Sequence, residues 1–161
     1  PDAPVEMRKQ AIFDIGQQES SENAAFLRGL YAKLTEPELK ERVLFAVSQM
    51  NGEGAGKWLL EIAANGKEPL DMRKKALFWA GQQSETSFSD FAGLYETMPD
   101  PEMKKQLIYV YAQRREPEAV DRLMEIARKE TDRDLRKQAL FWLGQSGDPR
   151  VEKFLEGILN K

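Results

Sequence analysis

The chain has 161 residues, of which 41% are hydrophobic and 32% are charged, so it can bury an apolar core and should be soluble. Its net charge of −3 provides no overall basic field, so affinity for nucleic acid would need a local basic patch. The absence of cysteine and histidine excludes disulfides, thiolate or histidine catalysis, and zinc held by these residues, and no apolar run approaches the roughly 18 residues of a membrane-spanning helix.

The N-terminal segment shows a pattern that continues along the chain. Apolar residues from Met7 to Ile15 recur at helical spacing, which predicts an amphipathic helix near 6–18. A polar loop separates this helix from a second stretch of helical periodicity near 23–34. Pro37 then suits the first turn of the following helix, where a missing N–H costs nothing.

Helices of two types alternate in this way to the end of the chain, and no alternating pattern typical of strands interrupts them. We call first-type helices those expected near 23–34, 55–64, 88–98, 118–129 and 149–159. We call second-type helices those expected near 6–18, 37–50, 71–83, 101–114 and 132–146.

Each second-type helix carries a copy of one stretch, which is clearest at Leu135–Gln145. With Leu135 as position zero, the equivalent residues lie 32, 33, 31 and 32 residues apart and are Met7, Leu39, Met72, Met103 and Leu135 itself. Such a period is typical of repeat architectures. Two helices per period predict an all-α solenoid of about five helical hairpins in a single domain spanning 1–161. Because the chain opens with a second-type helix and closes with a first-type helix, we expect a piece of a longer array or a domain whose ends are covered by something else.

The repeated unit resembles the short HEAT-like repeats of bacteria. The likeness rests on Leu135–Gly144 and on Asp148-Pro149-Arg150-Val151 followed by Phe154-Leu155, and it extends over essentially the whole chain. This resemblance implies a right-handed α-solenoid whose second helices line a concave face that holds a partner. It does not imply one activity, because the family includes adaptors, lyases, hydroxylases and glycosylases.

Placed on a helix, positions zero, +4, +7, +8 and +11 of each copy fall together and should face the first-type helices, with +2, +5, +6 and +9 on the opposite side. An aromatic residue occupies +6 in every copy. We call these residues the ring row: Phe13, Phe45, Phe78, Tyr109 and Phe141. Two interpretations remain open. The rings fill crevices between adjacent second-type helices, or they form a ladder that grips an extended or helical partner.

Two polar rows accompany the rings. Position +10 is glutamine in every copy, giving Gln17, Gln49, Gln82, Gln113 and Gln145. These amides either bond carbonyls of the neighbouring unit or bind the backbone of a peptide. Position +2 is lysine in four copies, and we include three of these lysines in the candidate site: Lys74, Lys105 and Lys137. Acids at −1 and bases at +1 recur in all copies, and they form either an internally paired surface or a stripe that attracts an acidic partner.

Signals for chemistry are weak. The segment from Gly52 to Lys57 is rich in glycine like a phosphate-binding loop, but Asn51 and Trp58 break the motif and no strand precedes it, so we expect a flexible turn. Asp14 stands where other copies have Ala, Trp or Val, and its exposure in the first repeat explains it better than catalysis. Trp58, Trp79 and Trp142 are expected in the core, although an indole at a groove margin would also be a good anchor.

We therefore expect a protein that is not an enzyme and needs no metal or cofactor. Its expected function is to bind a protein or peptide with the ring row, the glutamines and the three lysines. A structural spacer between domains and a nucleic-acid-binding helical repeat or glycosylase are the alternatives, and the acidic balance of the chain argues against the last. The sequence is compatible with the cytoplasm or with export after removal of an N-terminal segment.

Overall fold

The computed structural model describes residues 3–50 and 54–160, and every regular element within them is a helix. The all-α class and the alternation of helices expected from the sequence are confirmed. The chain forms two compact units, Pro1–Thr86 and Ser87–Lys161, which we name unit 1 and unit 2. A single domain over 1–161 and the right-handedness of the solenoid stay predictions.

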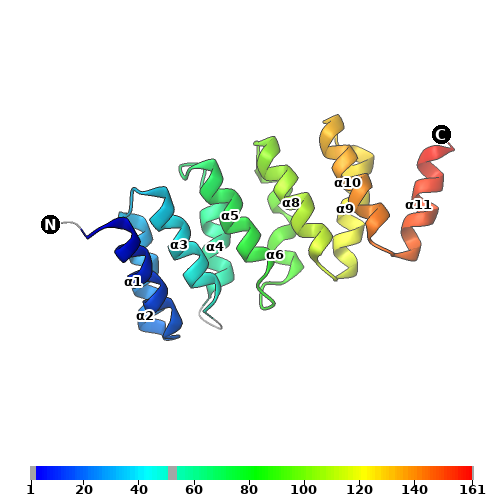
Figure 1. Ribbon diagram of the computed structural model, residues 1–161. Helices are drawn as coiled ribbons and strands as arrows, with labels where there is room; N and C mark the ends of the chain where they lie inside the picture. Colours follow the sequence, from blue (N-terminus) through cyan, green and yellow to red (C-terminus); the bar gives the residue numbers. More distant parts are fainter. Residues whose placement is uncertain (1–2, 51–53, 161) are drawn as a thin grey trace. The chain divides into compact units, whose positions relative to one another are not determined.

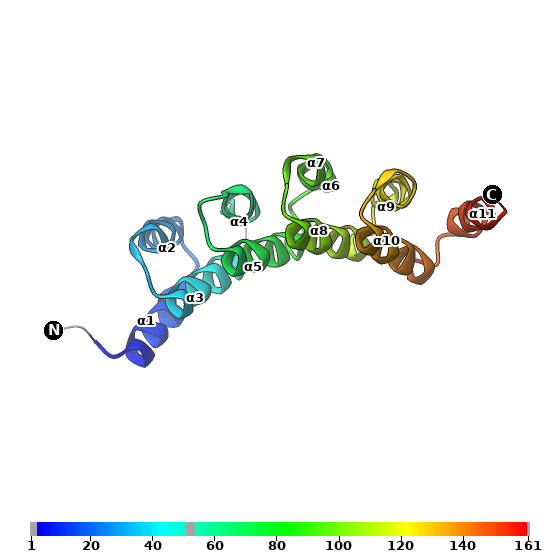
Figure 2. The ribbon, with the colours of Figure 1, turned by 90° about the horizontal axis from the view of Figure 1, so that it is seen from above.

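Unit 1 is built in two layers of helices. Second-type helices α1, α3 and α5 lie side by side in one layer, and first-type helices α2 and α4 lie in the other (Figures 1 and 2). The bounds are α1 Val5–Gln17, α2 Ser21–Lys33, α3 Pro37–Ser48, α4 Ala55–Ala64 and α5 Leu70–Gly81.

Unit 2 repeats this arrangement. Second-type helices α8 and α10 pack against each other, with α6, α7 and α9 in the other layer and α11 after α10 (Figure 2). The bounds are α6 Phe88–Ala92, α7 Leu94–Thr97, α8 Pro101–Gln113, α9 Pro117–Lys129, α10 Arg133–Gln145 and α11 Pro149–Leu159. None of the helices in the described ranges is both long and apolar enough to cross a membrane.

Local sequence signals set where the helices begin. Proline occupies the first turn of α3, α8, α9 and α11, where its fixed φ suits the helix. The side chains of Ser20, Asp100, Asp132 and Asp148 accept hydrogen bonds from backbone N–H groups of the first turn that have no partner within the helix. These caps mark the first turns of α2, α8, α10 and α11.

The core lies between the two layers and also between neighbouring second-type helices. Leu39, Val43 and Val47 of α3 are fully buried at positions zero, +4 and +8, as the helical spacing predicts. The prediction for position +5 is wrong, because Leu44 and Leu77 at that position are fully buried as well. The cause is packing on the flank, since each second-type helix contacts its second-type neighbour in addition to the first-type layer.

The expected helix over 88–98 is interrupted at Gly93 and forms α6 and α7 instead. Gly93 ends α6 with φ −87° and ψ −5°, and glycine has a low propensity for the interior of a helix. The hydroxyl of buried Tyr111 donates a 2.7 Å hydrogen bond to the carbonyl oxygen of Phe91, next to this interruption.

In unit 1, residues 51–53 of the glycine-rich segment lie outside the described residues, and Gly54 precedes α4 with a φ of +68°.

Candidate functional site

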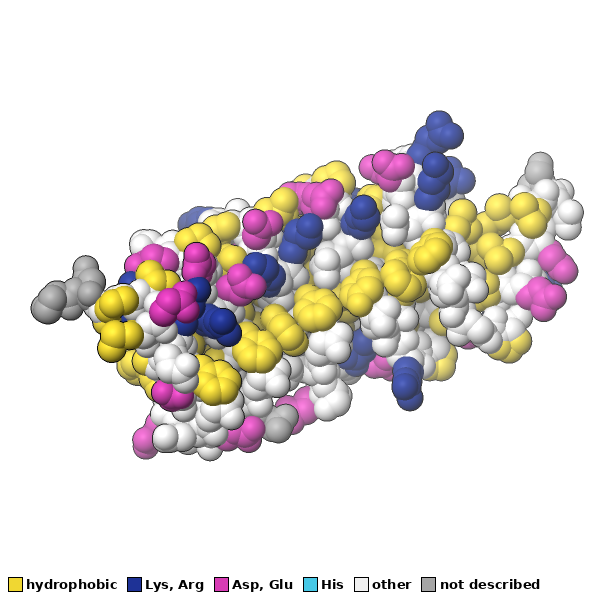
Figure 3. Space-filling model, in the orientation of Figure 1, with side chains coloured by type: hydrophobic (Ala, Val, Ile, Leu, Met, Phe, Trp, Pro, Cys, Tyr) yellow, Lys and Arg dark blue, Asp and Glu magenta, His cyan; other side chains and the backbone are white. Residues whose placement is uncertain are grey.

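Every member of the ring row keeps surface exposed to solvent. Phe13 on α1 is 43% exposed and Phe141 on α10 is 56% exposed, whereas Phe45, Phe78 and Tyr109 are half-buried. In each unit the hydrophobic side chains gather on the face formed by the second-type helices (Figure 3). The rings are therefore partly packed against the protein and partly open to solvent, and the grip on a partner stays a prediction.

The packing of the rings depends on the tryptophan at position +7. In unit 1, the indole of Trp79 makes edge-to-face contacts with Phe45 of the preceding second-type helix and with Phe78 of its own, at centroid distances of 5.1 and 5.0 Å. In unit 2, Trp142 contacts Tyr109 and Phe141 in the same way, at 5.5 and 5.1 Å. Both indoles are half-buried. Each +7 tryptophan thus bridges two successive rings of the row and is not fully buried in the core as expected.

The glutamines at +10 lie on the surface. All five are exposed, and Gln49 donates a 3.2 Å hydrogen bond to the hydroxyl of Ser48. Within the described residues, the amides of Gln17, Gln82, Gln113 and Gln145 make no hydrogen bond to a neighbouring repeat.

The bond between repeats comes instead from the next position in the sequence. Gln83, at +11, donates to the carbonyl oxygen of Ser48 at 2.9 Å and thereby connects the end of α5 to the end of α3. The repeat pattern did not reveal this residue, because it draws attention only to the invariant glutamine at +10.

Several bases on the second-type helices of unit 1 form ion pairs with acids. The ammonium of Lys9 on α1 lies 2.5 Å from the carboxylate of Glu38 on α3, and that of Lys75 on α5 lies 2.7 Å from Glu41 on α3. The carboxylates of Glu38 and Glu6 raise the pKa of Lys9, and the ammonium of Lys9 in turn lowers the pKa of Glu38. These pairs between α1, α3 and α5 indicate an internally paired surface on this part of unit 1. Lys74, one of the expected site lysines, is half-buried.

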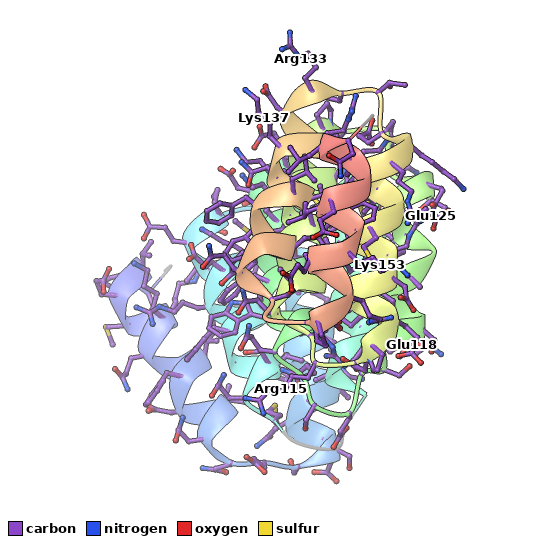
Figure 4. The ribbon with its side chains drawn as sticks, turned by 90° about the vertical axis from the view of Figure 1, so that its right-hand side faces the viewer. Arg115, Glu118, Glu125, Arg133, Lys137 and Lys153 are labelled. Atoms are coloured by element: carbon purple, nitrogen blue, oxygen red, sulfur yellow. The ribbon has the colours of Figure 1, made fainter. Side chains whose placement is uncertain are left out.

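The second-type helices of unit 2 carry a different charge pattern. Lys105 on α8 and Arg133, Arg136 and Lys137 on α10 are exposed, and no acid among the described residues lies within ion-pair distance of them. Figure 4 shows Arg133 and Lys137 projecting from the start of α10. Together these bases form a region of positive charge on the helices that carry the last two rings of the row.

One base at position +1 has a role that the sequence pattern did not indicate. Arg73 on α5 is 9% exposed, and its Nε donates a 2.9 Å hydrogen bond to the carbonyl oxygen of Ala63 in the last turn of α4. The base at +1 of the first copy, Arg8, pairs with an acid, because its guanidinium lies 2.8 Å from the carboxylate of Glu36. Arg73 instead satisfies a carbonyl that the end of a helix leaves without a partner.

The described residues bring together no group of three or more acidic side chains that could hold a metal ion. Asp14 is exposed on α1, and its carboxylate accepts a hydrogen bond from Gln10 at 2.8 Å, which explains it without chemistry. The candidate site therefore consists of rings, amides and bases.

Comparison with known families agrees with this geometry. The family model described as HEAT repeats matches residues 91–161, a range that begins within α6 and includes α8 to α11 of unit 2. No curated protein matches the chain. HEAT repeats generally serve as scaffolds for protein interactions, and the family is typically non-enzymatic. Residues 91–161 therefore match the HEAT-repeat family, and the helical hairpins of the described residues agree with this match.

Proposed function

We propose that this protein is a scaffold that binds a segment of another protein on the faces formed by its second-type helices. The observation that carries the proposal is the exposure of the ring row in both units. Phe13 and Phe141 expose roughly half of their surface, and contiguous exposed apolar patches on soluble proteins usually mark interaction sites. Aromatic residues also contribute much of the binding energy at protein interfaces.

The spacing along each second-type helix suggests how a partner is recognised. Positions +2, +6 and +10 are four residues apart, so they lie along one stripe of the helix surface. In α8 this stripe is Lys105, Tyr109 and Gln113, and in α10 it is Lys137, Phe141 and Gln145. Because α8 and α10 pack side by side, equivalent positions form parallel rows of cations, rings and amides.

These rows favour one chemistry of partner at unit 2. A segment with apolar side chains would cover the rings, acidic side chains would reach Lys105 and Lys137, and the glutamine amides would bond its backbone. Paired bases in unit 1 make the same surface there less positive, so the electrostatic preference for acids is expected mainly at unit 2.

The experiment compares two sets of exposed rings. The immobilised chain captures proteins from an extract of the source cells, and the wild type is compared with a Phe13→Ser/Phe141→Ser variant and with Phe26→Ser. Phe26 lies on first-type helix α2 and is 55% exposed, so its replacement removes exposed aromatic surface without touching the ring row. We expect the double variant to lose about tenfold or more in affinity for the specific partner, and the Phe26→Ser variant to retain it.

The same comparison decides between this function and the alternatives. Equal capture by all three proteins would contradict binding through the rings and favour a structural spacer. Captured nucleic acid whose binding falls steeply with rising salt would instead indicate phosphate contacts. Far-UV circular dichroism of each variant confirms that the helices are intact.

A further inference from the structure

Helix α1 exposes the face that the other second-type helices bury. Positions zero, +4 and +8 of α3, α5, α8 and α10 are all buried, and each of these helices packs against the first-type layer that precedes it. In α1 the same positions are open, since Met7 is 64% exposed, Ala11 is exposed and Ile15 is half-buried. This apolar face of α1 is therefore not covered by a described first-type helix.

Helix α11 exposes the matching face of a first-type helix. Leu159 is 82% exposed, Ile158 is exposed as well and Leu155 is half-buried. The equivalent positions of α4 and α9, at multiples of the 32-residue spacing, are all buried: Leu59, Ile62, Ala63, Leu123, Ile126 and Ala127. Because α4 and α9 pack against α5 and α10, α11 presents the surface that a second-type helix covers elsewhere in the chain.

Helix α10 is open on the flank that would face such a second-type helix. Position +5 is buried in the four preceding copies, whereas Leu140 of α10 is half-buried. At position +9, a Cβ added to Gly16 of α1 would meet Ala46 of α3, but no other described part of the chain lies within 4 Å of a Cβ added to Gly144. Both α10 and α11 therefore leave room for a further second-type helix.

Contacts between successive first-type helices relate two more exposed residues. The indole of Trp58 on α4 contacts the ring of Tyr31 on α2 edge to face, at a centroid distance of 5.4 Å. At multiples of the 32-residue spacing, Trp58 corresponds to Phe26 and Tyr31 corresponds to Leu159. Phe26 and Leu159 are both exposed, so the same contact would bury them if α2 of one copy followed α11 of another.

The ion pairs between second-type helices indicate a complementary charge. In unit 1, Lys9 at +2 of α1 pairs with Glu38 at −1 of α3, with 2.5 Å between ammonium and carboxylate. Lys137 at +2 of α10 is exposed, and no described acid lies within ion-pair distance of it. Glu6 at −1 of α1 is exposed, and its bond to Lys9 stays within the same helix. A second copy whose α1 follows α10 would therefore bring Glu6 to Lys137.

We propose that copies of this chain associate head to tail, with α1 of one copy packing against α10 and α11 of the next. In this arrangement α1 and α2 continue the two layers of unit 2 of the neighbouring copy. The two faces differ, so the contact is heterologous and each copy takes a neighbour on both faces. The face of α1 consists of positions zero, +4 and +8, whereas the ring row occupies +6, so this association goes beyond the function proposed above.

Sedimentation velocity of the purified chain, over about 5 to 500 µM, measures the association. We expect the weight-average sedimentation coefficient to rise with concentration. Met7→Glu and Leu159→Glu each place a charge on one of the two faces and should lower the association constant by about tenfold or more. The control is Lys57→Glu, because Lys57 is exposed on α4 and lies on neither face.

Mixing the two face variants distinguishes head-to-tail from symmetric association. Met7→Glu keeps the face of α10 and α11, and Leu159→Glu keeps the face of α1. An equimolar mixture should therefore form dimers at concentrations where each variant alone is monomeric. In addition, Glu6→Lys and Lys137→Glu should each weaken the association of the otherwise unchanged chain, and the chain with both substitutions should recover it.

Asp14 tests the register of the contact. Gly16 at +9 meets Ala46 at +7 of the next second-type helix, so Gly144 of one copy would meet Asp14, at +7 of α1, of the other. Asp14→Ala gives α1 the residue of α3 and removes a carboxylate from this contact, so the variant should associate at least as strongly as the wild type. Weaker association of Asp14→Ala would contradict this register.

Three results would overturn the proposal. The first is a chain that sediments as a monomer over the whole range of concentration. The second is association of Met7→Glu or Leu159→Glu that is as strong as that of the wild type or of Lys57→Glu. The third is a mixture of the two face variants that forms no dimer. Far-UV circular dichroism confirms that each variant is folded, and the function proposed above is judged separately by capture of the partner.

Discussion

Replacing Arg73 with methionine should destabilise the protein far more than the same change at Arg136, although both residues occupy position +1 of their repeat. Arg73 is buried and its Nε donates to the carbonyl oxygen of Ala63 at 2.9 Å. Methionine keeps the apolar stem but leaves this carbonyl unsatisfied. Hydrogen bonds from charged donors contribute about 1.5–3 kcal/mol, so we expect the free energy of unfolding to fall by about 2 kcal/mol.

Arg136 provides the matched control. It is exposed on α10 and its side chain makes no hydrogen bond or ion pair with a described residue, so Arg136→Met should change the free energy of unfolding by less than about 0.5 kcal/mol. Both variants are measured by urea unfolding followed by far-UV circular dichroism. Equal losses for the two variants, or a loss below about 0.5 kcal/mol for Arg73→Met, would refute the role assigned to Arg73.

Three further predictions concern packing, hydrogen bonding and pH. Gly16→Ala should be less stable than Gly144→Ala by about 1–3 kcal/mol in thermal or urea unfolding. The reason is that a Cβ at Gly16 meets Ala46, whereas no described atom lies within 4 Å of a Cβ at Gly144. Equal effects of the two substitutions would contradict the close approach of α1 and α3. Tyr111→Phe should cost about 1 kcal/mol in urea unfolding, since it removes the hydrogen bond to Phe91, and an unchanged midpoint would count against that bond. The guanidinium of Arg8 lowers the pKa of Glu36 from 4.5 to about 2, so the stability from this pair is present above pH 4.5 and is lost as the pH falls towards 2. The stability difference between wild type and Arg8→Gln should therefore shrink over that range, and a carboxyl titration of Glu36 near 4.5 by NMR in the wild type would disprove the coupling.

Much of the fold could be predicted from the sequence because the same helical pattern occurs in five copies. The period of about 32 residues, the prolines in first turns and the aspartate caps are local signals, and the structure forms helices where they indicate. The interruption at Gly93 could not be placed in this way, because a single glycine weakens a helix without deciding whether tertiary contacts hold it together.

The candidate site could be predicted only in part. The ring row follows directly from position +6, but the bridging role of Trp79 and Trp142 depends on how adjacent second-type helices are spaced. Similarly, burial of Leu44 and Leu77 requires knowledge of both neighbours of a helix, whereas a helical projection considers one face. Gln83 and Arg73 were missed for the same reason, since their partners are backbone carbonyls of other helices that the sequence pattern does not reveal.

Hydrogen–deuterium exchange of the chain, with and without its captured partner, tests the central claim most directly. If the partner covers the ring row, amide protection should increase in the second-type helices α1, α3, α5, α8 and α10, or in those of one unit, while α2, α4 and α9 remain unchanged. Protection confined to the first-type helices would show that the partner binds elsewhere and would contradict binding through the ring row.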